Sequence, residues 1–141
     1  MKNPILNYIR NNVLTPRAVK FAVVGSSGVL VNMGVLYLLT AVFHIFYAIS
    51  SVFAIETAII TNFLLNNAWT WKDRRQNSFG QRFRKFQSIS LAALLINWLV
   101  LIFFKEVAGY HYLQANLIGI ACGTAFNFVL NDVWTFKSDA S

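Results

Sequence analysis

The chain has 141 residues, a net charge of +7 and an apolar composition, with 57% hydrophobic and 12% charged residues. A soluble domain of this length does not need so many apolar residues, so the composition indicates an integral membrane protein. Charged residues are confined to a few segments, and the four long stretches between them contain a single charge, Glu56. Each stretch can hold a helix of about 18 to 23 residues, enough to cross about 30 Å of hydrocarbon. We therefore expect an all-α protein with four transmembrane helices and no separate catalytic domain.

The segment before the first stretch, residues 1–20, is basic. Ile5, Ile9 and Val13 recur in it at helical spacing, which predicts a short amphipathic helix on the membrane surface. A disordered tail is the alternative. The segment has no apolar core or cleavage site of a signal peptide.

Lys and Arg residues are distributed unequally between the two sides of the predicted helices. Four precede the first helix, six lie between the second and third, one follows the fourth, and Lys105 alone lies on the other side. The positive-inside rule then places both termini and the central loop in the cytoplasm, with the protein in the cytoplasmic membrane. The positive charge is explained by a rim that faces anionic lipid, so we expect no nucleic-acid partner.

Two stretches, NFLLNNAWTWKD (residues 62–73) and NFVLNDVWTFKS (residues 127–138), are nearly the same and lie 65 residues apart. The match continues upstream at the same offset, for example at Asn32 and Asn97. An internal duplication explains both observations. We refer to the repeated stretch as the Asn-Trp-Thr phrase.

The predicted repeats cover about 17–73 and 82–138 and form one transmembrane domain, residues 21–137, followed by a short tail at 138–141. Because each half crosses the membrane twice, both halves must have the same orientation. The sequence therefore predicts a 2+2 parallel repeat.

The Asn-Trp-Thr phrase ends each half where the second helix returns to the cytoplasmic surface. Trp69 and Trp134 are expected to be interfacial anchors, because Trp is common at this depth. The two asparagines of each copy are four residues apart and share a helix face, which should point into the bundle because amides in lipid are costly. These asparagines are Asn62, Asn66, Asn127 and Asn131.

Three polar residues lie deeper in the predicted helices. Asn32 and Asn97 fall near the bilayer midplane, where they meet, face one cavity, or form hydrogen bonds that only fix the packing. Glu56 has the strongest functional claim, because an ionisable group near the centre of a span costs about 2.5 to 3.5 kcal/mol. Its counterpart in the second half is Ala121, so the duplication is broken here. This asymmetry favours a role in function over a role in packing.

Small residues recur at a spacing of four on the second and fourth helices, at Ala54 and Ala58 and at Gly119 and Gly123. Such faces pack helices together, within the bundle or between subunits. The stretch GSSG, residues 25–28, lacks the Lys of a phosphate-binding loop, so close helix packing explains it better.

The sequence has no pattern typical of a catalytic or metal site. His44 and His111 both fall in outer turns, and Cys122 is the only cysteine. We therefore expect a protein that is not an enzyme, with no catalytic residues, no metal and no cofactor.

The segment RAVKFAVVGSSGVLVN and the repeated pattern N-F-x-x-N-x-x-W-T-[FW]-K resemble the GtrA-like family of small four-span membrane proteins. The resemblance covers nearly everything from Arg17 to Lys137. It implies a membrane component that helps translocate a polyprenyl-phosphate-linked monosaccharide for cell-surface polysaccharide glycosylation. It also implies a membrane glycosyltransferase as a partner.

One position departs from the family pattern, which usually has Arg after the second Asn of the phrase. Here Asn67 and Asp132 stand at these places. If that Arg contacts a lipid phosphate in relatives, this chain must use other cations, unless those cations only set the topology. The candidates are Arg17, Lys20, Arg82, Arg84 and Lys85. A polar path for the sugar would comprise Asn32, Glu56, Asn62, Asn66, Asn97, Asn127, Asn131 and Asp132.

Two other functions stay open. One is a non-transporting partner that recruits or stabilises a membrane glycosyltransferase. The other is a small proton-coupled exporter, against which the charge bias argues because many such exporters insert in both orientations. Since four helices offer little room for a sugar headgroup, we expect a homo-oligomer, packed partly through the small-residue faces.

Overall fold

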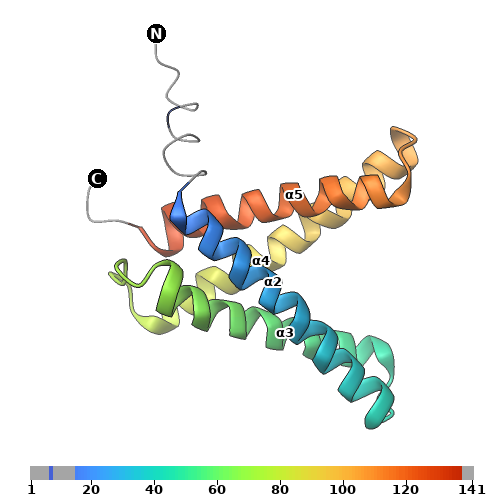
Figure 1. Ribbon diagram of the computed structural model, residues 1–141, viewed down its shortest axis with the longest axis horizontal. Coiled ribbons are helices and arrows are strands. Elements are labelled where there is room, and N and C mark those ends of the chain that lie inside the picture. The colour runs from blue at the N-terminus through green and yellow to red at the C-terminus, as the bar shows by residue number, and fades with distance from the viewer. Residues whose placement is uncertain (1–6, 8–14, 138–141) are drawn as a thin grey trace. The chain divides into compact units, whose positions relative to one another are not determined.

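The computed structural model describes residue 7 and residues 15–137, and in this part of the chain it contains helices and turns but no strands (Figure 1). The predicted surface helix before the first span and the tail at 138–141 lie outside the described residues.

Four long helices form the described chain: α2 (Pro16–Tyr37), α3 (Tyr47–Leu65), α4 (Phe79–Ile102) and α5 (Tyr112–Leu130). Each continues into a π-helical turn, namely η2 (Leu38–Val42), η3 (Asn66–Thr70), η4 (Phe103–Val107) and η5 (Asn131–Thr135). With its turn, each helix has the length and apolar composition to cross a membrane. The prediction of an all-α protein with four transmembrane helices is confirmed.

The chain divides into two compact units, Met1–Asp73 and Arg74–Ser141. In the first unit α2 runs beside α3, and in the second α4 runs beside α5, so each unit is a helical hairpin (Figure 1). The helices α3 and α5 begin at Tyr47 and Tyr112, which is again an offset of 65 residues. The same order of elements in both units is what the predicted duplication requires.

The turn between the two helices of each hairpin uses a left-handed backbone conformation. His44 has a φ of 54° and Gly109, 65 positions later, has a φ of 74°. Glycine adopts this conformation at little cost, whereas a residue with a Cβ has a conformational energy that is higher by about 1 kcal/mol or more. At the start of α5, Nδ1 of His111 accepts a hydrogen bond from the N–H of Leu113 at 3.4 Å. Both histidines therefore lie in the turns, as predicted.

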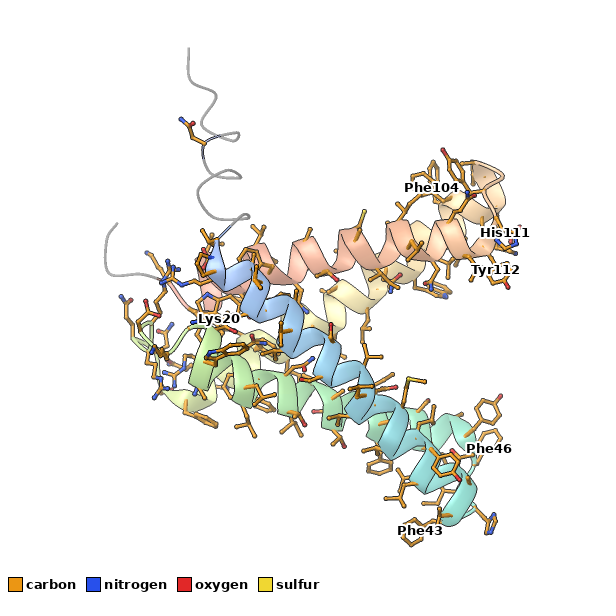
Figure 2. All side chains as sticks on the ribbon, in the orientation of Figure 1. Lys20, Phe43, Phe46, Phe104, His111 and Tyr112 are labelled. Carbon is orange, nitrogen blue, oxygen red and sulfur yellow. The ribbon has the colours of Figure 1, made fainter. Side chains whose placement is uncertain are left out.

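Aromatic side chains gather at these turns. Figure 2 shows Phe43 and Phe46 at the turn of the first hairpin, and Phe104 at the turn of the second. The ring of Phe104 packs edge-on against Phe103 and Tyr110, with centroids 5.4 Å apart in both cases. Of these residues, Tyr110 is of a type enriched at membrane surfaces.

Glycines let α5 approach α4 closely. A Cβ at Gly119 would lie 2.6 Å from the carbonyl oxygen of Asn97, and one at Gly123 would lie 2.8 Å from that of Ala93. The alanines at the matching positions of α3 are also buried. The glycine face of α5 thus packs against α4 within its own hairpin. Contacts between subunits of an oligomer would have to use other surfaces of α5.

Candidate functional site

In each hairpin, the Asn-Trp-Thr phrase lies where the start of the first helix meets the end of the second. In the first unit, Arg17 forms an ion pair with Asp73, with Nη2 and Oδ2 2.7 Å apart. Nearby, the ammonium of Lys20 lies 5.5 Å from the ring centroid of Trp69. Figure 2 shows Lys20 far from the turn at Phe43. We call this end of a hairpin, marked by Lys20 and Trp69 or by the matching Lys85 and Trp134, its basic end.

The phrase folds as a π-helical turn, which directs two consecutive residues inward. The N–H of Trp71 donates to the carbonyl oxygen of Asn66, five residues earlier, at 2.9 Å. Thr70 and Trp71 are only 2% and 0% exposed, while Trp69 is 45% exposed. Residues 131–136 repeat this arrangement in the second unit. All four helices end in such a turn, so it is the buried polar residues and the neighbouring cations that make the basic end a candidate site.

Trp71 and Phe136 form part of the buried core, and our sequence reasoning did not single them out. The sequence signal for their burial was that both copies of the phrase have an aromatic residue at this position. Trp69 and Trp134 are instead exposed, as an interfacial anchor must be. Their anchoring role stays a prediction.

The asparagines of the phrase take part in hydrogen bonds within their own hairpin. Nδ2 of Asn131 donates to Oδ1 of Asn127 at 2.6 Å and to its backbone oxygen at 2.9 Å. Asn127 in turn donates to Oγ of Ser90 on α4 at 3.4 Å. In the first unit, the hydroxyl of Thr70 donates to Oδ1 of Asn66 at 2.7 Å. Because Asn66 and Asn131 are 1% and 0% exposed, these two amides point inward, as expected.

Two other amides lie against glycines of the neighbouring helix. The side chain of Asn62 is next to Gly28 on α2, and that of Asn97 is next to Gly119 on α5. Each Oδ1 is buried and has no hydrogen-bond partner among the described residues. An unsatisfied buried acceptor costs about 1 to 3 kcal/mol, which glycine Cα hydrogens offset only in part. Both residues are half-buried, so the Oδ1 atoms face the neighbouring helix although the side chains are not fully enclosed.

Glu56 lies on α3, two residues from both Ala54 and Ala58. At about 100° per residue, its side chain projects from nearly the opposite side of the helix to theirs. The residue is half-buried, as is Asn32 on α2, whereas Ala121 at the matching position of α5 is exposed. Glu56 therefore stands outside the small-residue face of its helix. The expected meeting of Asn32 with Asn97 stays a prediction.

The structure sorts the predicted phosphate-binding cations by what they contact. Arg17 is paired with Asp73, as described above. Arg82 is 6% exposed, and its guanidinium donates to the backbone carbonyls of Arg75, at 3.3 Å, and Asn77. Both arginines thus have acceptors within the protein.

The remaining cations of this group are less engaged. The ammonium of Lys85 lies 5.1 Å from the ring centroid of Trp134, in the same arrangement as Lys20 and Trp69. Lys85 also donates a hydrogen bond to the backbone oxygen of Trp134 at 3.4 Å. Such positions over an indole stabilise a cation by about 0.5 to 2 kcal/mol. Arg84, next in sequence, is exposed.

A largely buried ion pair at the basic end of the second unit was not predicted. Nη1 of Arg74 lies 2.9 Å from Oδ1 of Asp132, and the two side chains are 15% and 7% exposed. The same nitrogen lies 3.4 and 3.5 Å from the backbone oxygens of Asp132 and Phe136. Where the family pattern has Arg, this chain thus has an acid that holds an arginine from a distant loop. A separation of 58 residues leaves no local sequence signal for such a pair.

We expect Asp132→Asn to destabilise the protein by about 1 to 3 kcal/mol, because Arg74 would lose its charged partner in a mostly buried place. Asp73→Asn is the matched control, since Asp73 is 55% exposed and its pair with Arg17 should contribute about 0 to 1 kcal/mol. Thermal unfolding of the purified protein in detergent measures both. Equal losses in the two variants would contradict the burial argument.

Four apolar helices in two hairpins define a multi-pass membrane protein. The chain belongs to the GtrA/DPMS transmembrane domain family, whose model matches residues 20–136. The resemblance noted in the sequence is therefore confirmed.

Two relatives show the same relationship. The chain is 40% identical over 115 residues to a dolichol-phosphate mannosyltransferase of Pyrococcus furiosus, a match that covers 82% of this chain and 32% of that protein. It is 30% identical over 117 residues to the uncharacterized membrane protein YngA of Bacillus subtilis, covering 83% and 77% of the two chains. The chain thus spans about a third of the length of the mannosyltransferase and most of the length of YngA.

Proposed function

We propose that this protein helps translocate a polyprenyl-phosphate-linked monosaccharide across the cytoplasmic membrane, for glycosylation of a cell-surface polysaccharide. The observation that carries the proposal is the 40% identity to a relative named for dolichol phosphate, which is a polyprenyl phosphate. In this proposal the chain itself performs no chemical reaction. Its work is to shelter a charged headgroup from the hydrocarbon.

The polar residues would divide this work by depth. The basic ends would hold the lipid phosphate at the membrane surface, where cations attract anionic headgroups. Deeper in the helices, Asn32, Glu56 and Asn97 would offer hydrogen bonds to the sugar. The Oδ1 atom of Asn97 is buried against Gly119, so a sugar would have to displace this packing to reach that atom. We expect a homo-oligomer to supply the remaining space.

This mechanism needs the basic ends in the cytoplasm, an orientation that the distribution of Lys and Arg supports. We expect a membrane-impermeant maleimide added outside the cell to modify Ala108→Cys and to spare Arg75→Cys. Both substitutions are made in a Cys122→Ala background and lie at exposed positions. Modification of Arg75→Cys in intact cells would contradict the orientation.

Reconstitution tests the function itself. Liposomes containing the purified protein and a fluorescent polyprenyl-phosphate sugar should move the lipid between leaflets faster than liposomes that contain an unrelated four-helix protein. An unchanged rate would contradict translocation by this protein alone.

One observation favours the alternative of a partner for a glycosyltransferase. The Pyrococcus relative is named a mannosyltransferase, and the segment that matches this chain is about a third of its polypeptide. If the purified protein moves no lipid but raises the activity of a membrane glycosyltransferase reconstituted beside it, this alternative replaces the first.

A further inference from the structure

We propose that Lys20 and Lys85 each bind a phosphate group of a membrane lipid, one in each hairpin, and that the indoles of Trp69 and Trp134 hold the two ammonium groups in place. The inference rests on the proposed function, because it names the cations of the basic ends that contact the lipid phosphate. It also assigns a positioning role to the two tryptophans besides anchoring.

Among the cations whose contacts are described above, these two lysines are held in place and still lack a counter-ion. Arg17 and Arg74 form ion pairs with Asp73 and Asp132. The guanidinium of Arg82 donates to backbone carbonyls and is 6% exposed. The charge of Arg17 and that of Arg74 are therefore already balanced by a carboxylate, and Arg82 is buried, so these arginines attract a phosphate less than an unpaired exposed cation does.

The two lysines differ from the arginines in their charge balance. In the described part of the chain, neither Lys20 nor Lys85 takes part in an ion pair, so both positive charges lack a counter-ion. Each ammonium has three N–H donors, and the face of an aromatic ring does not use them all. Donors therefore stay available for phosphate oxygens.

The indoles limit the freedom of the lysine side chains. The ammonium groups lie 5.5 and 5.1 Å from the ring centroids, inside the range of a cation–π contact. A long side chain that is already held in place loses less entropy when a ligand binds. The same pair occurs in both units at positions 65 residues apart, although other residues of the phrase differ between the units.

The depth of the pairs fits a lipid headgroup. Each pair lies near the last turn of a transmembrane helix, and the tryptophans are 45% and 49% exposed. Half-exposed indoles at such helix ends are typical of the headgroup region, where lipid phosphates are found.

Lipid binding by charge-neutralised variants tests the proposal. The double variant Lys20→Gln and Lys85→Gln is compared with Lys72→Gln and Arg75→Gln, which removes the same charge from exposed residues outside the predicted phosphate-binding set. Native mass spectrometry of the purified protein measures binding of undecaprenyl phosphate, phosphatidylglycerol and phosphate-free undecaprenol. We expect the lysine variant to bind the two phosphate lipids at least about tenfold more weakly than the wild type, and the control variant to bind them about as well as the wild type. Binding of undecaprenol should be the same in all three proteins.

A second comparison isolates the role of the indole. Trp134→Leu keeps the charge of Lys85 but removes its platform, so we expect about a threefold loss of phosphate-lipid affinity. Trp98→Leu, at an exposed position within α4, should leave the affinity unchanged. Equal losses in these two variants would overturn the positioning role.

Equal weakening by the lysine and control variants would overturn the site and indicate diffuse surface charge. Equal weakening for undecaprenol would overturn phosphate recognition. A lysine-dependent preference for undecaprenyl phosphate assigns the site to the proposed substrate, whereas a preference for phosphatidylglycerol supports the site and assigns it to bulk lipid. Because binding is measured without translocation, a failed translocation assay leaves this result standing.

Discussion

Gly119→Ala is expected to destabilise the second hairpin by about 2 to 3 kcal/mol. The new Cβ would lie 2.6 Å from the backbone oxygen of Asn97 and would also meet its amide group. A backbone carbonyl inside a helix cannot rotate away, so α5 would have to move outward from α4. The hairpin would then lose the close contact that Gly123 makes one turn further along.

Two other glycines provide a graded control. At Gly28 the atoms nearest to a Cβ belong to the side chain of Asn62, which can rotate, so we expect Gly28→Ala to cost about 1 kcal/mol. At Gly34 nothing lies within 4 Å, and Gly34→Ala should be neutral or stabilise α2 by up to about 1 kcal/mol, because alanine favours the helix. Loss of helical circular dichroism on heating in mild detergent measures all three. If Gly119→Ala unfolds no earlier than Gly34→Ala, the close packing described here is wrong.

Glu56→Ala is expected to abolish surface-sugar modification while the protein still inserts at normal levels. A half-buried carboxyl group in an apolar span costs about 2.5 to 3.5 kcal/mol by insertion scales, and it lies away from the small-residue face of its helix. Packing of the small-residue face therefore does not explain its presence. The measurement is surface-polysaccharide glycosylation in a strain that depends on this protein, with membrane levels determined in parallel.

Glu56→Gln separates two roles for this residue. If Glu56 carries a proton during transport, glutamine should be as inactive as alanine, because it does not titrate. If Glu56 only forms hydrogen bonds with the sugar, glutamine should keep part of the activity. Thr57→Ala is the adjacent control, since the Thr57 hydroxyl already donates to the Phe53 carbonyl oxygen at 2.7 Å. Wild-type modification with Glu56→Ala would exclude both roles.

Features set by local composition could be predicted from the sequence. Long uncharged stretches specified four membrane-length helices, because hydrocarbon excludes charge and requires backbone hydrogen bonds within each segment. The twice-written phrase located the candidate site at the end of α3 and of α5. It also predicted that Trp69 and Trp134 anchor the helix ends at the membrane surface, and the structure leaves both side chains exposed.

Features that depend on contacts between distant residues were decided only by the tertiary structure. The phrase ends in π-helical turns that bury Trp71 and Phe136, and a helical period of 3.6 residues does not predict such turns. The pair of Arg74 with Asp132 and the approach of Gly119 to Asn97 join residues on separate elements. Charge alone could not tell the engaged arginines from the two lysines over indole rings. Composition determines which segments enter the membrane, but the contact each polar group makes there depends on how closely the paired helices approach.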